Sequence, residues 1–193
     1  KAALSTQNPP DNIKLGCDID TGELNSGVGI LESLEVKGRK QLDLNGHTLR
    51  MYSAKTAMSD MITIRRGDLT VLDSSSGQKG TILGSTYNDS CYLFDIQYGK
   101  LTLNSGTLKV DAGSLKTETK WRRVIYCYVG GTVTINGGTL HVAPETYEGK
   151  NNAYGQYFEG EYGDLRNGYC GYTLMAANSC KVSINGGTFQ GPV

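Results

Sequence analysis

The feature that most constrains the fold of this chain is an internal repeat. Four segments share one pattern of alternating apolar residues followed by a tight turn: QLDLNGHTL (41–49), KLTLNSGTL (100–108), TVTINGGTL (132–140) and KVSINGGTF (181–189). A fifth, DLTVLDSS from position 68, fits with a short insertion before its Gly-Thr-Ile at 80–82. The first apolar residues of these segments, at 42, 69, 101, 133 and 182, are 27, 32, 32 and 49 residues apart. The repeat therefore predicts constant strands separated by connections of variable length.

A second short apolar strand precedes each repeat at a nearly fixed distance. These strands are LEV (34–36), ITI (62–64), FDI (94–96), IYC (125–127) and MAA (175–177). Each unit therefore reads as strand, turn, strand, turn and a brief third strand, with period-two alternation and no helical periodicity. A chain that returns to the same place in each repeat stacks like on like. The expected columns are Ile62, Phe94, Ile125 and Met175; Val36, Ile64, Ile96, Cys127 and Ala177; Leu42, Leu69, Leu101, Val133 and Val182; and Leu44, Val71, Leu103, Ile135 and Ile184.

This pattern, LDLNGHTL in particular, resembles the right-handed parallel β-helix of the pectate-lyase-like superfamily, especially the non-enzymatic domains of large bacterial surface proteins and adhesins. The resemblance implies an all-β, single-stranded solenoid of about five to six rungs. We expect one domain over 1–193, with an entry strand and cap at 8–23, rungs at 30–142 and 173–189, and an insertion at 143–172. We also expect that the protein continues beyond Val193 or self-associates at its open C-terminal end, because no amphipathic segment there covers the stacked core.

Asparagine recurs at one position after the second strand of the repeats. Asn45, Asn104, Asn136 and Asn185 are predicted to form a ladder in which each side-chain amide bonds to the next turn.

The five cysteines allow at most two disulfides. Cys127 falls in a core column and reads as a small buried apolar residue. Cys170 and Cys180 flank the end of the insertion and could form a disulfide at its base, whereas Cys17 and Cys91 have no obvious partner. No Cys pair has zinc-binding spacing, so a zinc site is not expected.

Composition narrows the range of partners. The 19 Lys and Arg residues balance 19 Asp and Glu, so the chain lacks the basic excess of a general nucleic-acid binder. It also lacks an apolar run of about 18 residues, and we expect no membrane insertion. The N-terminus has neither an initiator Met nor an apolar signal core, as expected if a secretion signal has been removed or lies upstream.

The insertion at 143–172 is the strongest functional signal in the sequence. It holds six of the twelve tyrosines, and tyrosine offers both an aromatic face and a hydroxyl group to a sugar or a protein surface. The predicted ligand-binding residues are Tyr147, Tyr154, Tyr157, Tyr162, Tyr169 and Arg166, with Tyr172 at the end of the insertion. The alternative is that these rings only pack the insertion against the flank of the solenoid.

Calcium is the one metal that the sequence suggests. Glu159, Glu161 and Asp164 provide hard oxygen ligands but do not match an EF-hand, and solvated acids are the commoner explanation of such a group. A second acidic group, Asp18, Asp20 and Glu23, is explained equally well by capped turns.

Catalysis has weaker support. In the resembled superfamily, polysaccharide lyases combine calcium-binding acids with an Arg or Lys base, and Arg65, Arg66, Arg122, Arg123 and Arg166 are candidates. We expect the paired arginines instead to be exposed charges at the edges of rungs. The paired carboxylates that a hydrolase needs are not evident, because Asp68, Asp73, Asp95 and Asp111 are scattered singly. No catalytic residue is therefore predicted.

The sequence favours a non-catalytic extracellular module, secreted or on the cell surface, that binds a polysaccharide or a host or partner protein in the manner of an adhesin. Two alternatives stay open. One is a fragment of a carbohydrate-active enzyme, such as a calcium-assisted polysaccharide lyase. The other is a structural segment of a stalk or tailspike.

Overall fold

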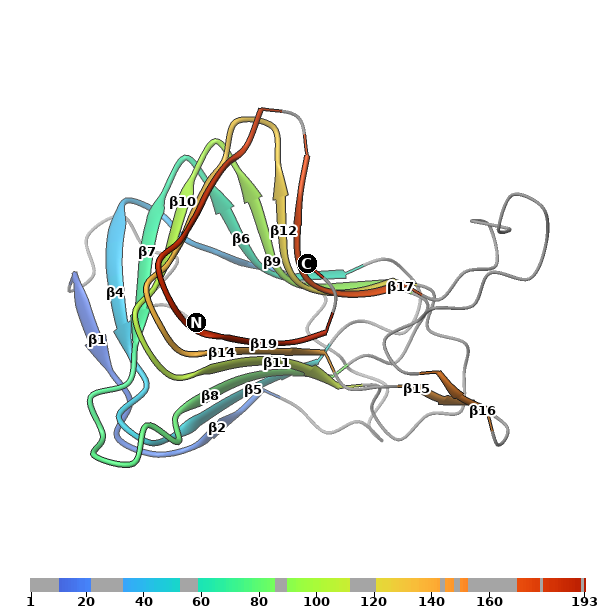
Figure 1. Cartoon of the computed structure of the whole chain (residues 1–193). Helices are drawn as coiled ribbons and strands as arrows, with labels where there is room; N and C mark the ends of the chain where they lie inside the picture. The colour runs from blue at the N-terminus through green and yellow to red at the C-terminus, as the bar shows by residue number, and fades with distance from the viewer. Residues whose placement is uncertain are drawn as a thin grey trace.

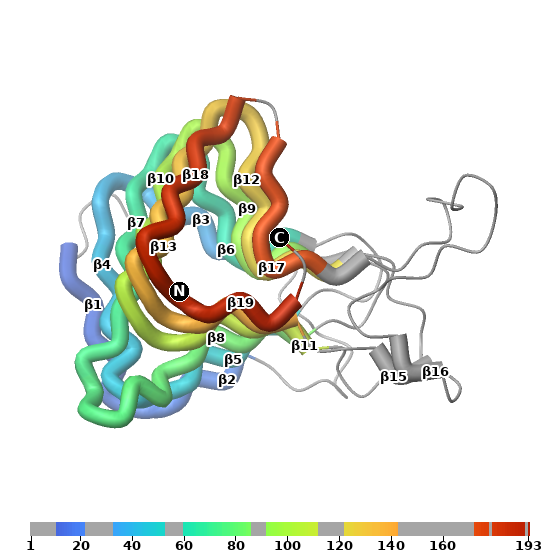
Figure 2. Tube along the Cα trace, viewed as in Figure 1, coloured from blue at the N-terminus to red at the C-terminus, as the bar shows by residue number. Residues whose placement is uncertain are grey.

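The computed structural model describes residues 11–21, 33–52, 59–85, 90–111, 121–142, 145–147, 150–152, 170–177, 179–191 and 193. These residues form an all-β parallel solenoid, with three parallel sheets around one core and no helix among them (Figure 1). Viewed along its axis the coil is three-sided, with earlier turns lying behind later ones (Figure 2). The predicted fold class is confirmed.

Each turn adds one strand to each sheet, so spatial neighbours are distant in sequence. Sheet A consists of β1 (Asn12–Lys14), β4 (Arg39–Asp43), β7 (Asp68–Leu72), β10 (Lys100–Leu103), β13 (Thr132–Ile135) and β18 (Lys181–Ile184). Sheet B consists of β2 (Ile19–Asp20), β5 (Thr48–Tyr52), β8 (Thr81–Ser85), β11 (Thr107–Asp111), β14 (Thr139–Val142) and β19 (Thr188–Gln190). Sheet C consists of β3 (Leu34–Glu35), β6 (Ser59–Arg65), β9 (Ser90–Gln97), β12 (Trp121–Tyr128) and β17 (Cys170–Ala176).

The insertion begins with a small antiparallel hairpin between β15 (Glu145–Tyr147) and β16 (Lys150–Asn152). Its expected end at 172 is too late, because β17 starts at Cys170 and Tyr172 already pairs with Arg123 of β12. The backbone around Tyr172 therefore belongs to the solenoid wall.

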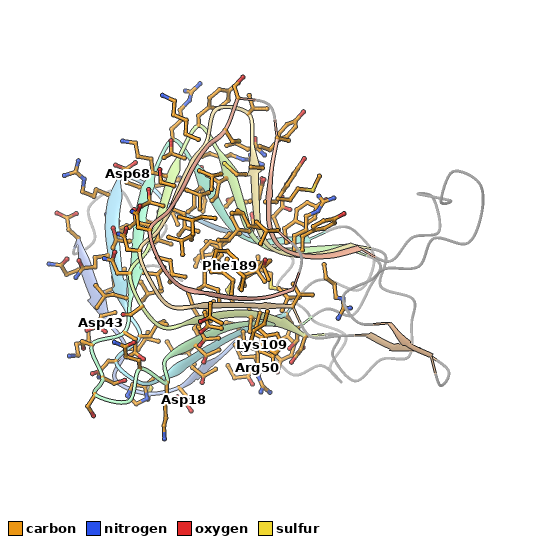
Figure 3. All side chains as sticks on the ribbon, in the orientation of Figure 1. Asp18, Asp43, Arg50, Asp68, Lys109 and Phe189 are labelled. Carbon is orange, nitrogen blue, oxygen red and sulfur yellow. The ribbon has the colours of Figure 1, made fainter. Side chains whose placement is uncertain are left out.

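The core consists of apolar columns that run through the three sheets. Leu69, Leu101 and Val133 are in register in sheet A and are at most 1% exposed. Burying each such side chain contributes about 1.5–3 kcal/mol relative to leaving it in water. In the last turn Val182 and Ile184 are 38% and 49% exposed, because no described strand lies beyond β18. Phe189 of the same turn is directed into the coil (Figure 3).

The first repeat is in a different register from the one predicted. Leu42 pairs with Val71, and Lys40 takes the position of Leu69. The corner after Leu42 holds five residues, whereas the corner after Leu103 holds three, so Leu44 fills the inside of the corner and does not continue the column. Lys40 is only 3% exposed, and its Nζ lies 3.6 Å from Oδ1 of Asp11.

In the last turn, the predicted members of two sheet C columns were wrong by one residue. Leu174, not Met175, pairs with Ile125, and Ala176, not Ala177, pairs with Cys127. The apolar run from Leu174 to Ala177 has no alternation of its own that could set the register.

The asparagine ladder is confirmed in three of its four members. Nδ2 of Asn136 donates to Oδ1 of Asn104, and Nδ2 of Asn185 donates to Oδ1 of Asn136, both at 2.8 Å. Asn45 is not part of the ladder. It lies in the longer first corner with a φ of 48° and donates to the carbonyl oxygen of Leu15.

Two aspartates organise the corners of the early turns, where the ladder is missing. Oδ1 of Asp73 accepts hydrogen bonds from the amides of Gly46 at 2.8 Å and Ser75 at 3.0 Å, and its Oδ2 accepts one from Gly80. Burial would raise the pKa of Asp73, but these bonds outweigh burial and hold that pKa below its ordinary value. Asp43 has the same balance, with Ser74 as its main donor.

These corners predict acid lability. A folded-state pKa below the unfolded value of 3.8 stabilises the fold above that pH, and this stability is lost as the pH falls through the folded pKa. We expect Asp73→Asn to lower the free energy of unfolding by about 2 kcal/mol at pH 7, because a buried charge-assisted network is broken.

Urea denaturation followed by circular dichroism from pH 2.5 to 7 provides the measurement. The difference between wild type and variant should shrink below about pH 4. Asp68→Asn is the control, because the Asp68 carboxylate makes long surface ion pairs of 3.9 Å with Arg39 and Lys100. A difference that is constant across this pH range would contradict the assignment.

Candidate functional site: a tyrosine and acid patch on sheet C

Most of the residues predicted to bind a ligand lie outside the described part of the chain. Tyr147 is placed only by its backbone, in β15. The remaining predicted site residues fall in the undescribed part of the insertion: Tyr154, Tyr157, Tyr162, Tyr169, Arg166, Glu159, Glu161 and Asp164. The sequence-based binding and calcium assignments thus stay predictions.

Sheet C has a bend that breaks the alternation of its strands. Two consecutive residues belong to the apolar core in each of three successive strands: Met61 and Ile62, Leu93 and Phe94, and Val124 and Ile125. Met61 and Leu93 face β8, since a Cβ on Gly84 would lie 2.8 Å from Sδ of Met61 and 3.2 Å from a methyl carbon of Leu93. Both residues of each pair therefore face the core, and the residues flanking the pair are on the outer side. Figure 1 shows β12 turning along its length.

The bend brings together side chains from before and after it. Arg123 precedes the bend and Tyr126 follows it, yet the Arg123 guanidinium lies 4.6 Å from the Tyr126 ring centroid and 4.7 Å from that of Tyr92. Nη1 of Arg123 also donates to the Tyr92 hydroxyl at 2.8 Å. The cation is thus held between two rings from neighbouring turns, a contact favoured by the negative face of each ring.

The rings continue outward from this contact. Tyr92 and Tyr126 have centroids 4.9 Å apart, and Tyr126 stacks on Tyr128 at 5.6 Å with an interplanar angle of 22°. Exposure rises along the row, from 7% at Tyr92 to 37% at Tyr128. The row therefore has one end fixed in the protein and one open to solvent.

Two carboxyl groups from adjacent turns complete the cluster. Asp95 is 2% exposed, and its Oδ2 accepts a hydrogen bond of 2.6 Å from Nε2 of Gln97. Oδ1 of Asp95 and Oδ1 of Asp60 are buried and accept no hydrogen bond from the described residues. We name the whole cluster the sheet C patch, and it consists of Asp60, Tyr92, Asp95, Arg123, Tyr126 and Tyr128.

Electrostatics within the patch favour neutral acids. Burial raises the pKa of Asp60 to about 6, the negative charge of Asp95 adds to this, and Arg65 opposes it. Burial also raises the pKa of Asp95, against the effects of Gln97 and Arg65. The two carboxyl groups cannot both be charged without cost, so the patch takes up a proton at a higher pH than ordinary carboxyl groups do.

Of the two arginine pairs that were predicted to be exposed, one is exposed and the other is buried. Arg65 and Arg66 are exposed at the corner after β6. Arg122 and Arg123 are 1% and 6% exposed, so the prediction that they are surface charges was wrong. The bend explains the error, because it turns both positions into packed surroundings that simple strand alternation does not reveal.

The early acidic group has a structural role in the described residues. Oδ1 of Asp18 accepts a hydrogen bond of 2.8 Å from the Thr48 amide and lies 3.4 Å from Nδ1 of His47. Asp20 accepts one of 3.2 Å from the Tyr52 hydroxyl. Glu23 lies outside the described residues. Within the described part of the chain, no three His, Cys, Asp or Glu residues gather closely enough to hold a metal ion.

The patch was missed because the sequence was read for inward columns. Strand alternation by itself predicts that Asp95, Tyr126 and Tyr128 lie on the outer side of these strands. Placing Asp60, Tyr92 and Arg123 beside them requires the bend.

No helix long and apolar enough to cross a membrane occurs in the described ranges. Comparison of the chain with family models, with curated proteins and with solved structures finds no match.

The raised pKa of Asp60 gives a prediction with a definite sign. A folded-state pKa of about 6 against an ordinary 3.8 means that ionisation costs the folded protein stability as the pH rises between those values. Asp60→Asn, which cannot ionise, should therefore gain stability relative to wild type from pH 4 to pH 6 and hold that gain above it.

Carbon-detected NMR of the carboxyl groups measures the titration directly. Asp60 should titrate near pH 6, and Asp95→Asn should lower that value by removing the neighbouring charge. Asp18 is an internal control, because the hydrogen bond from the Thr48 amide lowers its pKa. An Asp60 that titrates near 4 would refute the electrostatic description of the patch.

Proposed function

We propose that this solenoid is a non-catalytic, carbohydrate-binding module and that the sheet C patch is its binding surface. The observation that carries the proposal is the row of Tyr92, Tyr126 and Tyr128, graded from buried to exposed, beside the partly exposed carboxyl group of Asp60. Sugar rings present C–H faces that pack on aromatic rings and hydroxyl groups that donate to carboxylates.

The parts of the patch have separate roles in this proposal. Tyr126 and Tyr128 offer a stacking face at low entropic cost, because a tyrosine has few rotatable bonds. Arg123 keeps Tyr92 and Tyr126 in place through its two ring contacts. Asp60 is partly exposed, and its carboxyl group is the proposed hydrogen-bond partner of a sugar hydroxyl, although its Oδ1 atom is itself buried. The tyrosines of the insertion remain sequence-based candidates for contacts with the same ligand.

The wider setting of the proposal follows the sequence. A parallel β-solenoid related to the pectate-lyase-like surface domains and adhesins would act outside the cell, secreted or attached to its surface, on a polysaccharide or a glycosylated host or partner protein. The fold by itself supports no activity, because this architecture can carry many functions.

One observation favours a catalytic alternative. Asp60, with a pKa of about 6 next to Asp95, has the property expected of a general acid in glycoside hydrolysis. The lyase alternative loses one of its candidate bases, because Arg123 donates to Tyr92 and is only 6% exposed.

The proposal predicts that Tyr126→Ala and Tyr128→Ala each weaken polysaccharide binding about tenfold, as expected from the loss of roughly 1.4 kcal/mol of stacking energy. Affinity electrophoresis against a panel of neutral and uronic-acid polysaccharides, with and without calcium, provides the first measurement. Isothermal titration with oligosaccharides of the retained type then quantifies the effect.

Tyr98→Ala is the matched control. Tyr98 is 60% exposed, lies at the corner after β9 and is not part of the stacked row, so its removal should leave binding unchanged. Each lane is also assayed for released oligosaccharide. If the wild type releases product and Asp60→Asn does not, the protein is a hydrolase and the proposal of a non-catalytic binding module is wrong. Retention that is unaffected by both patch variants would overturn the assignment of this surface.

A further inference from the structure

A column of glycines marks the corner where each turn passes from sheet C to sheet A. Main-chain hydrogen bonds of 2.8–2.9 Å define this column. In each bond, the amide of the residue just after the corner donates to the carbonyl oxygen of the glycine in the preceding turn. The bonds run from Asp68 to Gly38, from Lys100 to Gly67, from Thr132 to Gly99 and from Lys181 to Gly131. The column is therefore Gly38, Gly67, Gly99, Gly131 and, in the last turn, Cys180. A cysteine thus stands where the preceding turns have glycine.

Glycine is required at Gly67, Gly99 and Gly131 because a side chain there would point into packed atoms. A Cβ on Gly99 would lie 2.5 Å from the carbonyl oxygen of Ile64, and one on Gly131 would lie 2.7 Å from Sγ of Cys127. Both contacts are closer than a real Cβ tolerates. The direction of the missing side chain is therefore toward the ends of the sheet C strands.

Cys180 has the room that the glycine positions lack. The residue of its own turn that corresponds to Cys127 is Ala176, which pairs with Cys127 and is small. Ser179, just before Cys180, has a φ of 65°, as Tyr98 has 56° before Gly99, so the corner keeps its shape in the last turn. The Cys180 side chain accordingly packs against the core cluster that contains Cys127.

The two thiols are direct neighbours. Burial raises the pKa of Cys127, and the Cys180 thiol lies within hydrogen-bonding reach of it. Cys127 is completely buried, whereas Cys180 is partly exposed. An oxidant therefore meets Cys180 first, and Cys127 can react only with what Cys180 brings to it.

We propose that Cys127 and Cys180 form a disulfide bond that fastens the last turn of the solenoid to the turn before it. With a low-molecular-weight disulfide as oxidant, the Cys180 thiolate attacks one of its sulfurs and releases one thiol. The Cys127 thiolate then attacks Sγ of Cys180 in the mixed disulfide and releases the second thiol. Two protein thiols are oxidised and one small disulfide is reduced to two thiols, so electrons and protons balance.

The position of the bond gives it a structural purpose. The closed loop runs from 127 to 180 and includes the entire connection between β14 and β17, which is the longest in the chain. A cross-link over a long loop removes much conformational entropy from the unfolded chain. It would hold β17 and β18 against β12 and β13 at the end where Val182 and Ile184 are most exposed.

Peptide mapping tests the proposal. The protein is incubated with oxidised glutathione at pH 8, its remaining thiols are alkylated in denaturant, and the chain is digested without reduction. Trypsin leaves Cys170 and Cys180 in one peptide, so chymotrypsin is added to cleave after Tyr172. The expected product links the Cys127 peptide to the Cys180 peptide. A Cys170–Cys180 link, or alkylation of both Cys127 and Cys180, would overturn the proposal.

Stability measurements provide a second readout that does not depend on ligand binding. Oxidation should raise the thermal midpoint of the wild type and of the control Cys170→Ala by several degrees, and reductant should reverse the rise. Cys180→Ala is expected to fold, because its position is partly exposed, and to show no shift with oxidant. An oxidation shift that survives in Cys180→Ala would also reject the bond.

Discussion

The main-chain hydrogen bonds between successive turns are the interaction on which the rest of this structure depends. In the three large sheets, strands pair in parallel with the equivalent strands of neighbouring turns, so a residue's neighbours are set by its position within the turn. Every side chain is thus stacked on its counterparts, and a favourable choice at one position is repeated through the molecule. The apolar columns, the asparagine ladder and the glycine corner are three results of this one constraint.

The corners show how the constraint tolerates variation. In the later turns a short corner places Asn104, Asn136 and Asn185 above one another, and their amides bond in sequence. The early corners are longer, and there Asp43 and Asp73 bind the amides that the longer loops leave free. A charged acceptor with several donors takes over the role of the amide ladder. The register of the strands survives because the extra residues are confined to the corner.

A bend within the strands of sheet C produces the candidate site. Sheet C bends at one level in all of its longer strands, and the bend exchanges the inner and outer sides of the residues that precede it. Arg123, Tyr92 and Asp60 are thereby placed next to Tyr126 and Asp95. A polar cluster of this kind costs stability, as the raised pKa values of both acids indicate. Groups with raised pKa values of this kind gather at functional sites, which is why the proposed function is assigned to this surface.

The repeats alone were sufficient to predict the parallel solenoid, most of the core columns, the burial of Cys127 and three rungs of the asparagine ladder. They succeeded because side-chain alternation and turn residues are local properties, and stacking multiplies them. They failed for Lys40, Asn45 and Met175, where corner length or a uniform apolar run hides the register. The sheet C patch and the contact of Cys127 with Cys180 depend on tertiary structure, because they join residues from different turns across a bend and a corner. Such distances are properties of the folded coil, and no local spacing in the chain encodes them.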